Sequence, residues 1–406
     1  MALQVRKSDT HDNQPYDRTW QAAQRWFHDL LSTRAAQSFF PYQDLESKHM
    51  LHSLLSAPAE YKNHTRRFTF SSTASIVYGF RVEDVSDSRF IGLFEYFEAL
   101  SDLIGKNLSL LADIYPMLQW LPDFLLPSRP RAEKMNTKTL NFFRSLWYRV
   151  VEDCDKGIAA KCFAMDLLKA QKIENFHDDL AAYTCGILLL GGSDLTSNEL
   201  VAFIQAMTLF PEVQKRAQEE LDKVCGDRMP TQEDFAQLPY IRACVKEIFR
   251  WMPTAVMGVP HAVTQDDYYM GYKIPEDAAI VCNTWTINMN PERYPNPRVF
   301  EPARYLGDER TSRASTVVAN PKERDHYLFG AGRRVCQGMD IAESAVLVGI
   351  ARILWAFKIS KAEGPNRELI TPDPEDLTGG VMICPMPFKV SILPRSEEKA
   401  KAIASE

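Results

Sequence analysis

Ten residues near the end of the chain, 329–338, place one cysteine in a setting that suits a metal-bound thiolate. They read Phe-Gly-Ala-Gly-Arg-Arg-Val-Cys-Gln-Gly. Gly332 and Gly338 permit tight, partly left-handed turns that leave backbone N–H groups pointing at the Cys336 sulfur, and Arg334 can turn its cationic group to the same side. The apolar run that follows predicts a helix, whose N-terminal dipole would also favour a charged thiolate.

A carboxylate and a guanidinium stand three residues apart at Glu247 and Arg250, in the segment Ile241 to Trp251, where apolar residues recur at helical spacing. On a helix these two side chains share a face and can form a charge-assisted pair. Taken alone, such a pair is usually a solvated surface pair that contributes little to stability.

A third motif, Gly191-Gly192-Ser193-Asp194-Leu195-Thr196, interrupts a helical stretch from about Phe176 to Thr208. Each of two adjacent glycines weakens a helix by about 1 kcal/mol. The motif therefore indicates a bulge, a packing kink or a close approach of the backbone to a ligand.

These motifs, in this order, resemble those of the cytochrome P450 family. The family's haem-ligand signature, Phe-x-x-Gly-x-Arg-x-Cys-x-Gly, is filled by Phe329, Gly332, Arg334, Cys336 and Gly338. The resemblance implies a mainly α fold with a small β region, in a single domain over residues 1–406 whose ends, 1–15 and 395–406, are disordered. It also implies haem b as the cofactor and Cys336 as its axial thiolate and sole protein metal ligand.

The same resemblance assigns roles to the other two motifs. Arg304, in the segment Phe300-x-Pro302-x-Arg304-Tyr305, completes a buried network with Glu247 and Arg250 that serves folding around the haem and not catalysis. Family members deliver protons through an acid and a threonine on the helix that crosses the haem. Here Leu195 stands where the threonine is usual, so Asp194 and Thr196 are the candidate catalytic residues, by a route that departs from the family pattern.

Further cofactor contacts follow from the resemblance. The family uses a Trp and an Arg four residues apart to hold a haem propionate, and the matching positions are Trp20 and the neutral Gln24. Arg25 can substitute, although an exposed basic residue on an amphipathic helix is an equally good interpretation. His261 matches a propionate contact. The segments Pro253 to Pro260 and Leu377 to Met382 resemble substrate-contacting segments.

Composition narrows the class of protein. The chain has 406 residues, 45% apolar content, a net charge of −6 and no Lys/Arg-rich run, which gives no sign of nucleic-acid binding. Its 8 cysteines show no C-x-x-C spacing. This argues against zinc sites and a disulfide scaffold and fits a reducing compartment.

Periodicity predicts helices and then a mixed region. The helices are expected at residues 21–31, 43–55, 66–78, 90–110, 131–151, 176–208, 211–224 and 241–251. The Val-, Tyr- and Ile-rich run from Gly258 to Cys282 predicts short strands, and Ile383 to Leu393 predicts an edge hairpin followed by a fraying charged tail.

The resemblance implies a monooxygenase that uses dioxygen and NADPH-derived electrons. A separate NADPH-cytochrome reductase must supply them, because the chain has no Gly-x-Gly-x-x-Gly fingerprint. Lys322, Arg324 and Arg333 are a candidate basic docking surface. The match is closest to filamentous-fungal enzymes of secondary metabolism, so we expect a monomer acting on a small apolar polyketide or terpenoid. Two alternatives stay open: a haem-thiolate isomerase or dehydratase, and a truncated haem-binding protein without catalysis.

Membrane association is expected to be peripheral. The aromatic, proline-rich segment Ile114 to Leu126 is either a buried connection between helices or, by its resemblance to the family's substrate-entrance loop, a patch that dips into a membrane. The first interpretation predicts a cytoplasmic protein and the second the cytosolic face of the endoplasmic reticulum. No segment is expected to span a bilayer. The N-terminal anchor, first sheet and first helices of the family are expected to be missing, because the segment Tyr16 to Trp20 follows them in relatives.

Overall fold

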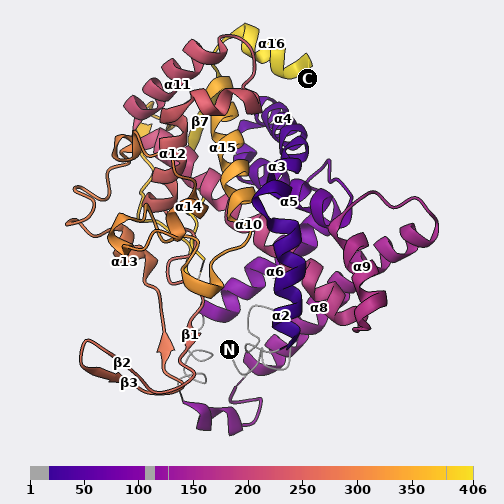
Figure 1. Cartoon of the computed structure of the whole chain (residues 1–406). Helices are drawn as coiled ribbons and strands as arrows, with labels where there is room; N and C mark the ends of the chain where they lie inside the picture. The colour runs from indigo at the N-terminus through magenta and orange to yellow at the C-terminus, as the bar shows by residue number, and fades with distance from the viewer. Residues whose placement is uncertain (1–17, 106–114, 127, 381, 406) are drawn as a thin grey trace.

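Helices dominate the computed structural model, which describes residues 18–105, 115–126, 128–380 and 382–405 (Figure 1). The α-helices are α2 (Arg18–Leu31), α3 (Thr33–Ser38), α4 (Phe40–Ser56), α5 (Tyr61–Tyr78), α6 (Ser88–Gly105), α8 (Ser128–Asp155), α9 (Phe163–Glu174), α10 (Asp178–Leu209), α11 (Pro211–Cys225), α12 (Pro239–Trp251), α13 (Thr284–Asn288), α14 (Ser312–Thr316), α15 (Met339–Ala356) and α16 (Glu397–Ser405). Short 3₁₀ helices are η2 (Pro58–Glu60), η3 (Pro116–Trp120), η4 (Gln232–Gln237), η5 (Pro302–Tyr305), η6 (Pro321–Glu323) and η7 (Gly332–Arg334).

The strands are few and short, and all their pairings are antiparallel. They are β1 (His261–Ala262), β2 (Asp267–Tyr269), β3 (Tyr272–Ile274), β4 (Ala279–Ile280), β5 (Phe357–Glu363), β6 (Leu369–Ile370) and β7 (Val390–Pro394). β1 pairs with β4 and β2 with β3, while β5 lies between β6 and β7. The expected short strands between Gly258 and Cys282 are therefore present.

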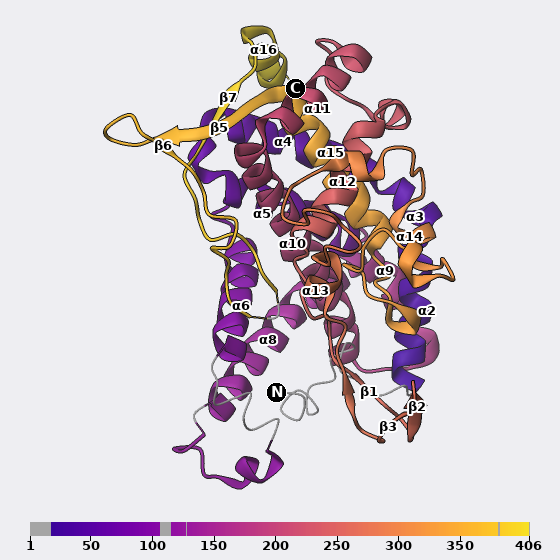
Figure 2. The same ribbon diagram turned by 90° about the vertical axis from the view of Figure 1, so that its left-hand side faces the viewer.

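Two apolar cores share one helix, α10. Its first half, from Ala181 to Leu189, packs in a core with α2, α6, α8 and α9, and its second half, from Leu200 to Met207, packs in a core with α4, α11, α12 and α15. Residues 190–199, between these halves, carry the Gly-Gly-Ser-Asp motif. They therefore lie where the two cores meet. Figure 2 shows α10 running through the middle of the molecule with α15 and α12 beside it.

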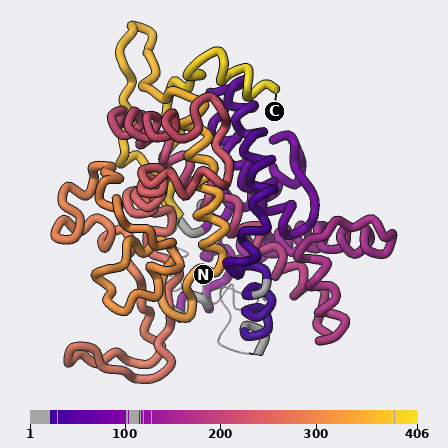
Figure 3. Tube along the Cα trace, turned by 45° about the horizontal axis from the view of Figure 1, so that its top comes forward, coloured from indigo at the N-terminus to yellow at the C-terminus, as the bar shows by residue number. Residues whose placement is uncertain are grey.

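The end of the chain differs from the expectation of a fraying tail. Residues 397–405 form α16, in which Lys399 and Ile403 are buried. Arg395 donates to the Asp222 carboxylate at 2.9 Å, and the Lys399 ammonium lies 3.2 Å from the same carboxylate and 5.3 Å from the Trp355 ring. These contacts with distant residues order the tail, and Figure 3 shows it beside the helices from the start of the chain. Residues 1–15 lie outside the described residues.

The expected hairpin at Ile383 to Leu393 is also wrong. Only Val390–Pro394 is a strand, and it pairs with β5, from Phe357 to Lys361, and not with a neighbour across a tight turn. β5 follows α15 directly, so the sequence pattern predicts that the apolar helix continues through the residues of β5.

Among the described residues, one helix is long and apolar enough to cross a membrane. It is α10, and 67% of its most apolar window is buried inside the fold. That burial is typical of a core helix.

Candidate functional site

The Cys336 loop turns through two left-handed glycines before it enters α15. Gly330 and Gly332 have φ angles of 73° and 68°, a region that favours residues without a Cβ. The Cys336 N–H donates to the Phe329 carbonyl at 2.9 Å, which closes the loop. Gly338 does not adopt the expected left-handed turn; its φ is −81°, because it is already the N-cap of α15.

Cys336 differs from the other cysteines in its environment. Its side chain is exposed, three residues before the first residue of α15, where the helix dipole favours a thiolate. Burial raises the thiol pKa of five others: Cys162, Cys185, Cys225, Cys244 and Cys384. Those five are therefore neutral, inert core residues at physiological pH.

The donor set fits a haem. Within residues 18–105, 115–126, 128–380 and 382–405, no group of three His, Cys, Asp or Glu side chains could hold a bare metal ion. A single exposed thiol on a left-handed loop suits an iron that a prosthetic group already holds and that needs one further ligand from the protein. A Cβ at Gly330, Gly332 or Gly338 would meet no atom within 4 Å, so the loop surface has room for a planar group to approach.

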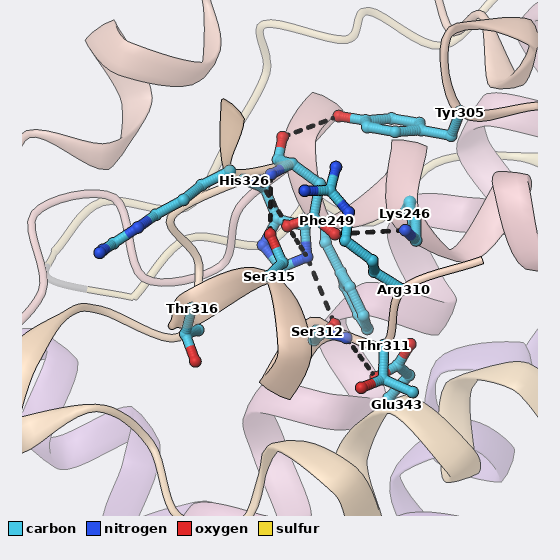
Figure 4. A network of polar contacts seen from close by, with 12 residues as sticks. Lys246, Phe249, Tyr305, Arg310, Thr311, Ser312, Ser315, Thr316, His326 and Glu343 are labelled. Atoms are coloured by element: carbon cyan, nitrogen blue, oxygen red, sulfur yellow. Dashed lines mark hydrogen bonds and ion pairs between the residues drawn. The ribbon is translucent and has the colours of Figure 1, made fainter. Parts of the chain in front are cut away.

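A buried polar network anchors the start of this loop (Figure 4). The His326 N–H donates to the Asp325 carboxylate at 2.9 Å, and the His326 ring Nε2 lies 3.5 Å from the Ser312 hydroxyl. The Ser312 N–H donates to the Glu343 carboxylate of α15 at 3.0 Å. Lys246 of α12 places its ammonium 3.5 Å from Asp325. The network thus ties the segment before Cys336 to α12, α14 and α15.

The network also holds the position of Phe329. The His326 ring lies 5.6 Å from the Phe329 ring, and Phe249 of α12 lies 5.3 Å from both rings. Burial lowers the pKa of His326 and raises that of Glu343, so both side chains favour their neutral forms.

The middle of α10 presents an open face opposite its buried side. Ile187, Leu188, Leu190, Gly192 and Leu195 are half-buried and Gly191 is exposed, although the residues on either side along the helix are fully buried. We call Leu188, Gly191, Gly192 and Leu195, which fall within an arc of about 100°, the open face of α10. The helix runs through the motif without a bulge. A Cβ at Gly192 would lie 2.6 Å from the Thr73 hydroxyl oxygen, whereas one at Gly191 would meet nothing within 4 Å. Gly192 therefore permits the packing of α5, and Gly191 leaves the open face clear.

Asp194 does not pair with Thr196 in this structure. Its Oδ1 lies 3.4 Å from Arg66 of α5, and its Oδ2 accepts a hydrogen bond from Asn198 at 3.1 Å. Burial raises the pKa of Asp194, while Arg66, Asn198 and Lys62 oppose that rise. Thr196 is buried. The Asp194 carboxylate thus contacts α5 and the next turn of α10.

The structure brings Glu247, Arg250 and Arg304 together. Arg250 donates two hydrogen bonds of 2.7 Å to the Glu247 carboxylate, and both residues are fully buried. Arg304 Nε lies 3.5 Å from the same carboxylate, and the Glu301 N–H donates to it at 2.8 Å. Burial raises the pKa of Glu247 against the effect of these cations.

Arg25 and His261 lie in exposed positions. The Arg25 guanidinium lies 3.6 Å from Glu174 of α9 in a surface ion pair, with a side chain 64% exposed. His261 is exposed on β1. Trp20 lies in α2, and its side chain is outside the described residues.

Among the residues of α2 considered for a haem contact, Gln24 is the one whose side chain contacts the Cys336 loop. Its amide oxygen accepts a hydrogen bond from the side chain of Gln337, the residue after Cys336. Arg334 ends η7, half-buried, two residues before the cysteine. Sequence reasoning passed over Gln337 because a glutamine after the cysteine carries no charge signal.

Comparison with known proteins gives a consistent result. A family model described as Cytochrome P450 matches residues 6–392. The chain is 43% identical to the cytochrome P450 monooxygenase virE of Hypocrea virens, over 95% of this chain and 70% of that protein. It is 44% identical to the cytochrome P450 monooxygenase fogE of Aspergillus ruber, over 96% of this chain and 72% of that protein.

Solved structures show the same fold. A zebrafish cytochrome P450 structure with progesterone superimposes with a TM-score of 0.78 at 20% identity, covering 97% of this chain and 86% of that one. The mainly helical fold with small sheets is thus the one expected from the sequence.

Proposed function

This chain belongs to the cytochrome P450 family, and on that premise we propose that it is a haem-thiolate monooxygenase acting on a small apolar substrate. The observation that carries the proposal is the exposed Cys336 at the N-terminus of α15, on a loop closed by its own N–H. Bound there, haem supplies the oxidising power for inserting an oxygen atom into a C–H bond. Residues 1–406 act as one such domain.

In this proposal, the residues of the chain hold the haem, fix the position of the Cys336 loop and exclude water from the site. Cys336 would bind the iron, Phe329 and Arg334 of the same loop would contact the haem, and Gln337 fixes the loop to Gln24 of α2. The apolar side chains Leu188 and Leu195 on the open face of α10 exclude water from the opposite side of the site. His261 and Trp20 stay candidates for the propionates.

The carbon monoxide difference spectrum of the reduced, purified protein tests this proposal. A thiolate-type Soret band is expected for the natural protein and should be lost in Cys336→Ala. Cys154→Ala, at a half-buried cysteine far along the chain from the loop, is the control and should keep the band. A thiolate band that survives in Cys336→Ala would assign the iron to another ligand.

Electrons come from an NADPH-dependent flavoprotein reductase in this proposal. Lys322 and Arg333 are exposed beside the ligand loop, and they offer a basic surface to an acidic partner. Arg324 is less available, because it is half-buried and donates to the Val318 carbonyl at 3.1 Å.

The substrate class is a polyketide or terpenoid, supported by the apolar open face of α10 and by the curated relatives being fungal monooxygenases. Such skeletons are largely hydrocarbon and partition into membranes. Peripheral contact with the cytosolic face of the endoplasmic reticulum would give the enzyme access to them.

A second candidate, a haem-thiolate isomerase or dehydratase, is favoured by one observation. Leu195 offers no hydroxyl, and the Asp194 carboxylate is in contact with Arg66 of α5. Such an enzyme needs no electrons from a reductase. Product formed without NADPH and reductase would therefore support this candidate and exclude the monooxygenase.

A further inference from the structure

A buried carboxyl group, Glu199, lies on the same side of α10 as the open face. At 100° per residue, Leu188, Gly191, Gly192, Leu195 and Glu199 fall within an arc of about 100°. Glu199 is one turn beyond Leu195 and is 3% exposed. Asp194 lies about 100° away from Leu195 around the helix. Of the two acids, Glu199 is thus the one whose direction around the helix is nearer to that of Leu195.

The two oxygens of Glu199 have different surroundings. Oε1 accepts the Thr254 hydroxyl at 2.7 Å and the Thr254 N–H at 3.1 Å. Oε2 is buried and has no hydrogen-bond partner among the described residues. The Thr254 backbone carbonyl in turn accepts a hydrogen bond of 2.8 Å from the Ile383 N–H, next to the isolated β-bridge between Ala255 and Met382. The acid therefore contacts one of the two segments expected to contact substrate, 253–260, and that segment pairs with the end of the other.

We propose that Glu199 is the proton-holding group of this site, one helical turn from the position at which the chain has Leu195 and no hydroxyl. The proton resides on Oε2, passes to a water on the open face of α10 and is replaced from bulk solvent. One proton moves and no electron does. The inference rests on the proposed monooxygenase function.

Burying an ionisable carboxyl group at this position is unfavourable. Its presence therefore indicates that the carboxyl group has a function. A glutamine would accept the same two hydrogen bonds from Thr254 through its amide oxygen. What distinguishes glutamate is the exchangeable proton on Oε2. Burial raises the pKa of Glu199 to about 8, although the Thr254 hydrogen bonds oppose the rise. A buried acid that holds its proton at neutral pH is typical of functional sites.

The charged groups near Glu199 do not favour its ionisation. Lys62 and Arg66 on α5 and Asp194 on α10 share an environment with Glu199, since all four affect the pKa of the Cys384 thiol, which burial raises to about 12. Arg66 contacts Asp194 and not Glu199. The cations of α5 therefore compensate Asp194, while Glu199 is left to the desolvation that keeps it neutral.

Infrared difference spectroscopy on the holoenzyme tests the proton directly. The spectrum of the natural protein minus that of Glu199→Gln should show the carbonyl stretch of a protonated carboxylic acid at pH 6.5, and this band should titrate away near pH 8. Thr254→Val removes one hydrogen bond that favours the ionised form. It should therefore keep the band and move its titration to higher pH.

Turnover provides the second readout, with a flavoprotein reductase, NADPH and dioxygen. Glu199→Gln should lower oxygen-dependent NADPH oxidation about 10-fold or more and raise peroxide released per NADPH. Glu220→Gln is the control, because Glu220 caps α12 by accepting the Tyr240 N–H at 2.9 Å on another part of the fold. It should change neither ratio.

The outcomes separate this inference from the proposed function. An ionised Glu199 at pH 6.5, or unchanged oxidation and peroxide ratios in Glu199→Gln, overturns the proton-holding role and leaves a structural anchor for Thr254. A natural protein without the thiolate carbon monoxide band overturns the monooxygenase proposal as well.

Discussion

At the scale of single residues, Leu195 and Asp194 decide how well oxygen activation is coupled to product. Leu195→Thr places a hydroxyl on the open face of α10, one turn before Glu199, where a proton can be relayed. We expect more product per NADPH and less peroxide. Asp194→Asn removes the partner of Arg66 at 3.4 Å and should slow oxygen activation without changing substrate affinity. Stopped-flow kinetics with product and peroxide assays measure these effects.

Thr208→Val is the matched control, since it changes a buried hydroxyl on α10 that donates to the Ile204 carbonyl at 2.9 Å, beyond the motif. It should leave coupling nearly unchanged. If Leu195→Thr and Asp194→Asn are both silent, protons do not travel along this stretch of α10, and the isomerase candidate gains support.

Glu199 also makes a prediction about stability and pH. Its pKa in the folded protein is about 8, above the ordinary value near 4.3 expected in the unfolded chain. Between these values, only the folded state holds the proton. The free energy of unfolding should therefore fall by about 1.4 kcal/mol for each unit of pH in that window, and level off above pH 8.

Glu199→Gln removes this dependence, so it should unfold at a higher temperature than the natural protein at pH 7.5 and at nearly the same temperature at pH 4.5. Thermal unfolding followed by circular dichroism at both pH values measures the difference. Equal melting temperatures at pH 7.5 would mean that Glu199 is already ionised in the folded protein.

At the scale of elements, the pair Glu247 and Arg250 joins α12 to the segment that carries Arg304. Removing Arg250 leaves a fully buried carboxylate without its two hydrogen bonds of 2.7 Å, at a cost of about 3–5 kcal/mol. Arg304 is partly exposed and lies at 3.5 Å, so Arg304→Ala should cost less. Haem content per protein and the unfolding midpoint measure both.

Lys273→Ala provides the comparison, because Lys273 and Asp266 form a pair at 2.6 Å whose side chains are about half-exposed. Its loss should cost under about 1 kcal/mol and leave haem content intact. An Arg250→Ala protein with full haem content and normal stability would refute the structural role of the network.

Elements could be predicted from sequence where local pattern sets them, and not where distant contacts do. The helix from Pro211 to Cys225 starts at its proline, and α10 was expected within two residues of its bounds. α9 was missed, although seven of its 12 residues are apolar and Asn175 ends it in a left-handed conformation. α16 was missed because its order comes from Asp222 and Trp355, which lie far away in sequence.

The same limit applies within the site. Residue types at fixed spacing singled out Cys336 and the pair Glu247 and Arg250, whereas Arg304 came from the resemblance to a family segment. The contact of Gln24 with Gln337 could not be found in this way, because charge favoured Arg25 and only the packing of α2 shows which side chain meets Gln337. Glu199 carried a readable signal, an acid four residues after Leu195 on one helical face.

At the scale of the whole molecule, the net charge of −6 makes the basic residues beside the ligand loop stand out. Lys322→Glu combined with Arg333→Glu should raise the reductase concentration needed for half-maximal turnover several-fold, because like charges slow encounter. Added salt screens the attraction, so it should raise the reductase concentration that the natural protein needs toward the value for the variant. Lys172→Glu on α9 is the control; equal losses in both variants would remove this surface as the docking site.

The apolar surface at one end of the molecule leads to the last prediction. Trp120 and Phe124 are 91% and 80% exposed, so their segment is not the buried connection that was one of its two interpretations. The hairpin β2–β3, with Tyr268 and Tyr272 also exposed, lies toward the same end in Figures 1 and 2. Aromatic side chains on two protrusions suit a membrane interface.

Trp120→Ala with Phe124→Ala should therefore reduce sedimentation of the protein with phosphatidylcholine vesicles, because burying each aromatic ring at the interface contributes roughly 1.5–3 kcal/mol. Carbon monoxide binding in solution should not change, since these rings lie outside both cores. Ile173→Ala, at a residue 83% exposed on α9, is the control and should sediment like the natural protein. Equal sedimentation of all three proteins would show that vesicle binding, if it occurs, uses another surface.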